Sequence, residues 1–210
     1  MVTAGPTWEF LDPLRYLTNR STGMMGYEVA SVARQRGHRV TLLSGPSSLR
    51  PPRGVRLLRV TTAREMRTAT FRALAQADAL VMAAAVADYR PARVHPAKLK
   101  RAHHTATLPL VANPDILAEV GRRFGGRKVL VGFALESADV LTQARRKLRT
   151  KRVDCIIGNT VRPGHVTFGA QPLADVVLLD RQGVQCRRRR ASKHWVAQQI
   201  LQFIEQRAAG

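Results

Sequence analysis

Acidic residues, lysines and long apolar runs are all scarce in this chain of 210 residues. It has 14 Asp and Glu against 35 Lys and Arg, a formal net charge of +21, and six of the 35 basic residues are Lys. No apolar run approaches the roughly 18 residues that a membrane-spanning helix needs, so we expect no membrane segment. A basic-then-apolar leader is also missing from the N-terminus, and we expect a cytoplasmic protein.

Several catalytic and metal-binding signatures are absent as well. The two cysteines, Cys155 and Cys186, lack metal-ligand spacing and are expected to be reduced thiols. The six histidines show no HExxH spacing, and no GxSxG elbow is present, which argues against metal-dependent and serine hydrolases. Neither GxGxxG nor GxxxxGK[ST] occurs, so the dinucleotide and P-loop fingerprints are missing too.

The positive charge would attract any polyanion, whether a nucleoside triphosphate, a phosphorylated metabolite or a nucleic acid. Basic residues are spread along the chain, with local runs at 145–152 and 187–190. No helix-turn-helix, zinc-finger or RNA-stacking motif accompanies them, so specific nucleic-acid binding is not expected. A basic module that binds nucleotides or nucleic acid without catalysis stays open as an alternative.

Strand and helix patterns alternate along the chain. Strand patterns cover residues 2–4, 39–43, 55–60, 79–82, 129–133 and 154–158, with a late antiparallel hairpin at 173–184. Helical patterns begin near 22–25 and cover 63–76, 114–124, 137–151 and 191–207. Repeated βα units predict an α/β fold with a mostly parallel sheet and helices on both faces. Ligands of such sheets bind beyond the C-terminal ends of the strands.

A loop of about 17 residues, which we expect to be irregular, follows the first strand, and loops of that length are more often functional than idle. The next helix carries Gly23 and Gly26 near its start. The first amides of a helix lack partners, so this N-terminus could hold a phosphate. The alternative is a Ser or Thr cap with two glycines for close packing on the sheet.

Polar or small residues follow other predicted strands. Ala83 and Ala84 would let a flat ligand approach the backbone, and Asp88 could bind a ribose hydroxyl or a phosphate-bound metal, or simply cap a loop. Lys147 and Lys151 are four residues apart on one helix face. They could bind one triphosphate or form an ordinary exposed basic face.

Two further segments also have two interpretations. Asn113 is placed to cap a helix that begins at Pro114, which needs no functional explanation. The segment 93–101, RVHPAKLKR, is either a solvated charged loop or a mobile flap that closes Lys98 over a phosphorylated substrate.

Blocks of this sequence resemble the phosphopantothenate–cysteine ligase (phosphopantothenoylcysteine synthetase) family. They are TAGPT at 3–7, DPLRYLTNRSTGMMG at 12–26, SGP at 44–46, AAAVADYR at 83–90, PAKLKR at 96–101, NPDIL at 113–117 and VGFALE at 131–136. They follow the family's order over residues 2–160. In most bacteria this enzyme is the C-terminal half of a bifunctional coenzyme A biosynthesis protein.

The resemblance implies a modified Rossmann-like fold, a homodimer and a single ligase domain over 1–210, with a flap near 90–112 and a C-terminal hairpin and helix near 170–208. It implies that CTP, with Mg²⁺, activates the carboxylate of 4′-phosphopantothenate as an acyl-cytidylate. The amine of L-cysteine then displaces CMP. Because the flavin-dependent decarboxylase half is absent, no flavin is expected.

The resemblance also assigns roles to individual residues. Asn19 matches an asparagine that handles the acyl-cytidylate, Lys98 matches the flap lysine, and Arg15 is expected to contact phosphopantothenate together with Asn19. Positions that match nucleotide contacts are Ser21, Gly23, Gly26, Met82, Ala83, Ala84, Asp88, Lys98, Asn113, Pro114, Asp115, Ile116, Phe133, Lys147 and Lys151. No metal ligand is assigned.

The sequence departs from the family's pattern within two of its segments. Met24 stands where a charged residue is usual, and residues 170–173, AQPL, replace a Ser-Asp-x-Asn-type turn. A different enzyme class, an NAD(P)-dependent reductase, is disfavoured because GxGxxG is missing. In addition, the strand at 39–43 is followed by Ser44 and Gly45 rather than by an acidic ribose-binding residue.

Overall fold

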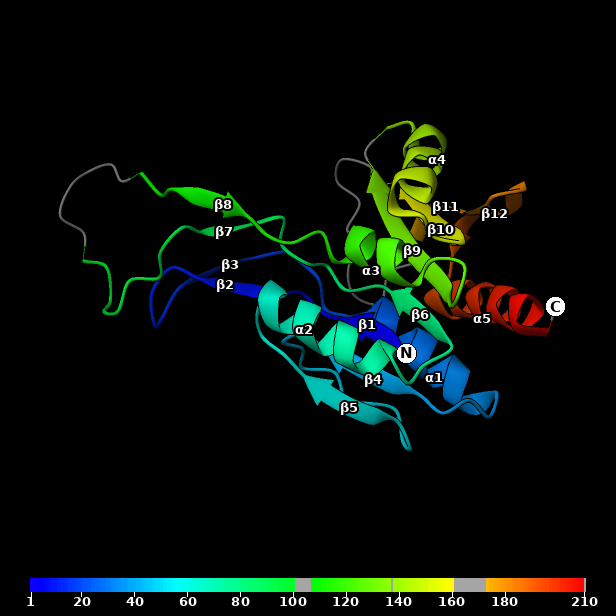
Figure 1. The fold of residues 1–210 in the computed structure, drawn as a ribbon, viewed down its shortest axis with the longest axis horizontal. Helices are drawn as coiled ribbons and strands as arrows, with labels where there is room; N and C mark the ends of the chain where they lie inside the picture. Colours follow the sequence, from blue (N-terminus) through cyan, green and yellow to red (C-terminus); the bar gives the residue numbers. More distant parts are fainter. Residues whose placement is uncertain (101–106, 137, 161–172, 210) are drawn as a thin grey trace.

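The computed structural model describes residues 1–210 except 101–106, 137, 161–172 and 210 (Figure 1). The strands of its main sheet are β1 (Val2–Ala4), β4 (Thr41–Ser44), β5 (Arg56–Arg59), β6 (Ala79–Met82), β9 (Val129–Glu136), β10 (Cys155–Thr160), β11 (Leu173–Asp180) and β12 (Gly183–Ala191). Within the described residues they form one sheet in the order β12-β11-β10-β9-β6-β1-β4-β5. The neighbouring strands β10, β9, β6, β1, β4 and β5 run parallel to one another. Strand β11 pairs antiparallel with β10, and β12 pairs antiparallel with β11.

Helices cover both faces of this sheet. They are α1 (Met24–Gln35), α2 (Ala63–Leu74), α3 (Ile116–Phe124), α4 (Val140–Lys151) and α5 (Lys193–Ala209). Buried side chains of α1 and α5 pack on one face with Val81 of β6, and those of α2, α3 and α4 pack on the other with Leu80 and Met82. Both faces of the central strands are therefore buried, which is why these strands are apolar throughout. The predicted α/β class, with its late antiparallel hairpin, is confirmed.

The prediction of an irregular loop after β1 is wrong. Strands β2 (Trp8–Phe10) and β3 (Tyr16–Thr18) form an antiparallel hairpin there. The rings of Trp8 and Tyr16 stack with centroids 4.2 Å apart, and aromatic contacts between neighbouring strands stabilise such pairs. Strands of three residues are too short to show the alternation of apolar and polar residues that marks a strand. The sequence pattern therefore did not predict this pair.

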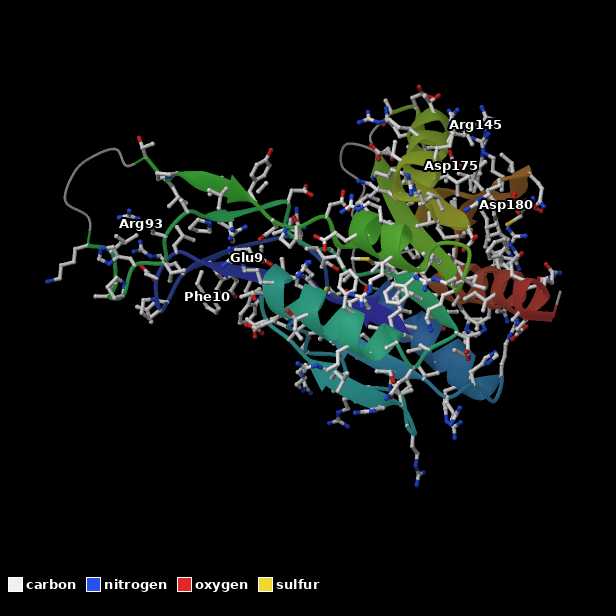
Figure 2. The ribbon with its side chains drawn as sticks, in the orientation of Figure 1. Glu9, Phe10, Arg93, Arg145, Asp175 and Asp180 are labelled. Atoms are coloured by element: carbon white, nitrogen blue, oxygen red, sulfur yellow. The ribbon has the colours of Figure 1, made fainter. Side chains whose placement is uncertain are left out.

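The hairpin is part of a projection that we call the arm, made of β2, β3, β7 (Tyr89–Pro91), β8 (Leu110–Ala112) and the described loops between them (Figure 1). Strand β7 pairs with β8 and contacts β2. Glu9 lies where the arm meets α2 (Figure 2). Glu9 is 3% exposed, and its carboxylate accepts a hydrogen bond from the Ala63 N–H at 2.9 Å. A buried carboxylate at a helix N-terminus thus ties the arm to the body of the domain.

Helix α3 begins later than predicted. Its N-cap is Asp115, whose carboxylate accepts from the Ala118 N–H at 2.9 Å, so neither Asn113 as cap nor Pro114 as first helical residue is correct. The Asn113 amide instead donates to the Ala87 carbonyl at 2.9 Å. Both Asn and Asp favour caps, and local sequence does not decide between two candidates placed two residues apart.

Other predicted boundaries shift by a few residues. The helix expected at 63–76 ends at Leu74, that at 137–151 begins at Val140, and that at 191–207 covers Lys193–Ala209. Within the predicted flap near 90–112, residues 101–106 lie outside the described part of the chain. The same holds for residues 170–172 of the altered turn.

We predict that Gly26→Ala destabilises the domain. A Cβ at Gly26 would lie 2.6 Å from the Ala4 Cβ and 2.7 Å from the Thr3 carbonyl oxygen. Overpacking of this kind costs about 1–3 kcal/mol, whereas Ala in a helix interior would otherwise gain roughly 1 kcal/mol. Urea unfolding should show a lower free energy of unfolding, while Ser31→Ala on the same helix should stay within about 0.5 kcal/mol of the parent. An unchanged or higher stability of Gly26→Ala would show that α1 does not contact β1 in this way.

Candidate functional site

A cavity of about 860 Å³ lies at the C-terminal edge of the parallel strands, and we call it the edge cavity. It is bounded by the ends of β6, β9 and β10, the N-terminal turns of α1 and α3, and one face of α4. The predicted site residues that line it are Asn19, Ser21, Gly23, Met82, Ala83, Ala84, Asp88, Asn113, Pro114, Asp115, Ile116, Phe133, Lys147 and Lys151. Residues that are far apart in the sequence therefore meet at one place. Arg15, Gly26 and Lys98 are not among the residues that line this cavity.

The N-cap residue of α1 is Gly23, which has no capping side chain, and the preceding Thr22 Oγ1 accepts from the Met24 N–H at 3.4 Å. Gly23 has φ 85°, and a Cβ there would lie 2.9 Å from the Gly5 nitrogen, so both conformation and space require glycine. Among the described residues, no acceptor faces the N–H groups of Met25 and Gly26. This end of α1 can therefore donate to an anion. Gly26 itself packs on β1, as the close-packing interpretation expected.

Asn19 is held against the loop that follows β6. Its Nδ2 donates to the carbonyl oxygens of Ala85 and Val86, both at 3.1 Å. The preceding Thr18 hydroxyl donates to the Thr7 carbonyl at 2.9 Å, which fixes the chain that leads into the site. Both N–H groups of the carboxamide are thus engaged, and a ligand would have to compete for them.

Both lysines of α4 are paired with carboxylates at the cavity wall. Lys147 Nζ lies 3.0 Å from a Glu136 oxygen, and Lys151 forms an ion pair with Asp115. Burial alone would raise the pKa of Asp115, but the hydrogen bonds from Lys151 and the Ala118 N–H outweigh it and hold that pKa below its ordinary value. These pairs orient the two ammonium groups, and an anionic ligand could take over as their partner.

Asp12 and Arg15 contact the backbone of Leu99, the residue that follows Lys98. The Asp12 carboxylate is fully buried and accepts from the Arg15 guanidinium at 2.9 Å (Nε) and from the Leu99 N–H at 3.1 Å. Arg15 Nη2 also donates to the Leu99 carbonyl at 2.7 Å. The Asp12–Arg15 pair therefore holds both backbone groups of Leu99, the residue next to Lys98. In this structure the Arg15 guanidinium, predicted to contact substrate, makes structural contacts on the arm.

Comparison with known proteins agrees with this architecture. The family model described as the DNA/pantothenate metabolism flavoprotein C-terminal domain matches residues 1–208. The chain belongs to this family. The resemblance drawn from the sequence blocks is thereby confirmed, since the family includes the C-terminal domain of the bifunctional coenzyme A biosynthesis proteins.

Individual members of the family match closely. The bifunctional coenzyme A biosynthesis protein CoaBC of Vibrio vulnificus is 45% identical over 163 residues, which is 77% of this chain and 41% of that protein. CoaBC of Bacillus subtilis is 43% identical over 171 residues, or 81% and 42% of the two chains. A crystal structure of the C-terminal domain of CoaBC aligns with a TM-score of 0.82 at 34% identity, covering 99% of this chain and 94% of that one. The chain spans about two fifths of the length of the curated relatives it matches.

Some residues that line the edge cavity of this family member were not predicted. Asn159 lies at the end of β10 and Lys193 at the start of α5. Asn159 could have been found, because it follows the strand predicted at 154–158 just as Asp88 follows another. Lys193 carries no such signal, since it is brought to the cavity by the packing of α5. Burial lowers the pKa of the Lys193 amine.

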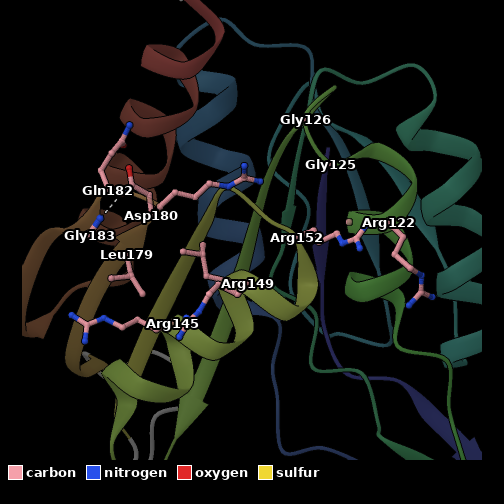
Figure 3. A pocket seen from close by; sticks show the side chains of 13 residues that line it. Arg122, Gly125, Gly126, Arg145, Arg149, Arg152, Leu179, Asp180, Gln182 and Gly183 are labelled. Carbon is pink, nitrogen blue, oxygen red and sulfur yellow. Dashed lines mark hydrogen bonds between the residues drawn. The ribbon is translucent and has the colours of Figure 1, made fainter.

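A second cavity, of about 750 Å³, lies around the C-terminal ends of α3 and α4 and the β11–β12 turn (Figure 3). None of the predicted site residues lines it. Its walls carry Arg122, Arg145, Arg149, Arg152 and Arg181. Helix C-termini carry partial negative charge, which arginines at the ends of α3 and α4 offset. The edge cavity, with its free helix amides, is therefore the better candidate for binding an anion.

We predict that Asp12→Asn loosens the Lys98 segment of the arm. The Arg15 hydrogen bond, with further bonds from backbone N–H groups, overcomes burial and holds the pKa of Asp12 well below its ordinary value. Hydrogen exchange at the Leu99 amide should become faster in the variant, whereas Asp88→Asn, on the exposed rim of the edge cavity, should leave it unchanged.

The same contact should depend on pH. Because the pKa of Asp12 is depressed by folding, its stabilising effect is complete above the ordinary Asp value of about 3.9 and is lost as the pH falls below that towards the folded value. Acid unfolding of the parent should therefore show this loss, and Asp12→Asn should not. Equal Leu99 exchange in both proteins would show that Asp12 does not anchor the segment.

Proposed function

We propose that this chain forms a single ligase domain that joins 4′-phosphopantothenate to L-cysteine, through a CTP-derived acyl-cytidylate that releases first pyrophosphate and then CMP. The observation that carries the proposal is the edge cavity, where a free helix N-terminus, two oriented lysines and a rim carboxylate face one space. Membership of the family and the names of its relatives support the same chemistry. An NAD(P)-dependent reductase is a poorer fit, because β4 ends at Ser44 without an acidic residue.

The proposed reaction needs positioning and charge compensation more than a protein nucleophile. A carboxylate must be aligned with the α-phosphate, and cations must offset the charge that builds on the leaving pyrophosphate. The N-terminal amides of α1 can bind phosphate oxygens. Lys147 and Lys151 can exchange Glu136 and Asp115 for the phosphates of CTP. Packing on β1 holds the α1 amides in place, and the ion pairs with Glu136 and Asp115 orient the two lysines.

Magnesium enters this proposal as a companion of CTP. Within the described residues, no group of three or more His, Cys, Asp or Glu side chains could hold a metal ion by itself. Mg²⁺ is commonly bound by one or two carboxylates together with substrate phosphates, and the exposed Asp88 on the cavity rim fits that arrangement. The ion would neutralise part of the charge on the leaving pyrophosphate. The matched region is a C-terminal domain, so the proposal contains no flavin chemistry.

The proposal includes a homodimer. Large apolar side chains are exposed along the arm, and such patches commonly mark protein interfaces. They are Leu14, Tyr16, Tyr89, Val94, Leu108, Leu110 and Val111. The arm consists of two antiparallel pairs of short strands, β2–β3 and β7–β8. Packing of the arm against a second copy of the chain would bury these side chains.

A cytoplasmic location is also part of the proposal. None of the helices in the described part of the chain is long and apolar enough to cross a bilayer. Cys155 and Cys186 form no disulfide in the structure. Burial raises the pKa of the Cys155 thiol, which keeps it protonated and unreactive.

We predict that the domain releases pyrophosphate from CTP when 4′-phosphopantothenate is present, even without cysteine. Lys147→Gln and Lys151→Gln should each slow this release roughly 10- to 100-fold, as expected for the loss of a charge that stabilises a transition state. Arg145→Gln is the matched control, because it removes one positive charge from α4 on the side of the second cavity (Figure 3). Equal losses in all three variants would point to net charge and not to the edge cavity.

We predict that Asn19→Asp accumulates acyl-CMP. The substitution removes the N–H donors of Asn19 and leaves carboxylate oxygens opposite the carbonyls of Ala85 and Val86. Quenched reactions analysed by mass spectrometry should show the intermediate without the cysteine product. Lys98→Gln is the contrasting variant, which should lose pyrophosphate release itself while its circular dichroism stays that of the parent. Full activity of either variant would remove that residue from the mechanism.

A further inference from the structure

The second cavity brings together arginines from segments that are far apart in the sequence (Figure 3). Arg122 belongs to α3, Arg149 to α4, and Arg152 is the residue that ends α4. Within the described part of the chain, none of these three forms an ion pair with a carboxylate. Arg181 lies in the turn between β11 and β12, and its nearest carboxylate, that of Asp154, is 3.9 Å away. Like charges gathered in this way repel one another unless an anion binds between them.

The negative groups around this cavity offset only part of that charge. Asp180 is the one acidic residue among the described residues that line it, and it is 5% exposed. Its Oδ1 already accepts hydrogen bonds from the N–H groups of Gln182 and Gly183, at 2.8 and 3.1 Å, and from Gln185 Nε2 at 2.9 Å. The C-terminal ends of α3 and α4 add about −0.5 elementary charge each. With Asp154 included, the five arginines still exceed the negative groups by about two charges.

The cavity has the size of a ligand site. Its volume of about 750 Å³ lies within the range of roughly 300–1,000 Å³ that is usual for small-molecule pockets. Leu148 and Leu179 are buried and contribute apolar surface to its wall. Gly125 and Gly126 line it as well, so a ligand can approach the backbone there. Arg145 reaches away from the arginines of α3 and of the α4 C-terminus, so it adds charge without contributing to the contacts considered below (Figure 3).

The side chains of the cavity favour a small molecule with several phosphate groups. A guanidinium donates two parallel hydrogen bonds to a phosphate, a geometry that a lysine cannot supply. Arg149 lies on α4 and Arg181 on the β11–β12 turn, so a ligand that contacts both must carry anionic groups at more than one point. No aromatic side chain is among the described residues that line the cavity. Single-stranded nucleic acids usually stack their bases on aromatic rings, so they fit this site less well.

Helix α4 separates this cavity from the edge cavity. Lys147 and Lys151 line the edge cavity, whereas Arg149, two residues from each of them, lines the second one. Residues two apart in a helix point about 200° away from each other, so the two sets of cations lie on opposite faces of α4. A ligand in the second cavity would therefore leave the edge cavity open.

We propose that the second cavity is a separate binding site for a small molecule that carries two or more phosphate groups. Arg149 and Arg152 bind it from the α4 side, Arg122 from α3 and Arg181 from the hairpin turn. This site does not depend on the proposed use of CTP, and its occupant is not consumed in the ligase reaction.

Nuclear magnetic resonance titration with inorganic tripolyphosphate in 0.15 M NaCl tests the proposal, because this salt concentration screens loose surface binding. The amide signals of Gly125 and Gly126 report on the second cavity, and that of Gly23 reports on the edge cavity. In the parent, the Gly125 and Gly126 signals should shift and saturate. Arg149→Gln combined with Arg181→Gln, both on exposed side chains, should raise the midpoint of those shifts at least tenfold, the scale of one charged hydrogen bond. The midpoint of the Gly23 shift should stay the same, which also shows that the variant is folded.

Arg56→Gln combined with Arg59→Gln is the matched control. It removes the same charge from exposed positions on β5, at the opposite edge of the sheet, and should leave the Gly125 and Gly126 midpoints unchanged. Shifts that grow without saturating, or an equal weakening in the control, would reduce the site to nonspecific attraction and overturn the proposal. A ten-residue oligothymidylate that shifts the same signals at lower concentration than tripolyphosphate would also overturn it, in favour of a nucleic-acid surface.

Discussion

The close contact between α1 and the central strand β1 is the constraint on which the site depends. Gly26 lets the helix lie directly on the strand, and Gly23 turns the chain in a left-handed conformation beside Gly5. With the helix so close, its N-terminal amides lie at the edge of the sheet where the parallel strands end. The capacity to bind an anion is thus a property of packed backbone, which no charged side chain would replace.

Net charge says little about where an anion binds in this domain. Helix α4 carries cations on two faces, and one of them lines the second cavity at helix C-termini. The lysines of the other face differ because Glu136 and Asp115 hold them at the edge cavity. In a chain with a net charge of +21, their position and their ion-pair partners distinguish these two lysines from the other basic residues of α4.

Although acidic residues are few, three of them make buried contacts that connect separate elements of the fold. Glu9 joins the arm to the N-terminus of α2, and Asp12 joins the β2–β3 hairpin to Leu99. Asp154 accepts from the Leu130 N–H at 2.9 Å between two neighbouring strands. Each of these carboxylates is buried and meets backbone N–H groups that would otherwise lack a partner.

The sequence by itself determined the βα alternation and the common location of Asp88, Lys147 and Lys151, because parallel strands all end at one edge and local patterns suffice to find those ends. Only the tertiary structure decided the β2–β3 hairpin, the exchange of Asn113 for Asp115 as the cap of α3, and the contacts of Asp12. Those features depend on which distant segments lie side by side. Asn159 belongs to both groups: the sequence indicates its place at the end of a strand, but its burial in the wall of the edge cavity depends on how distant elements pack.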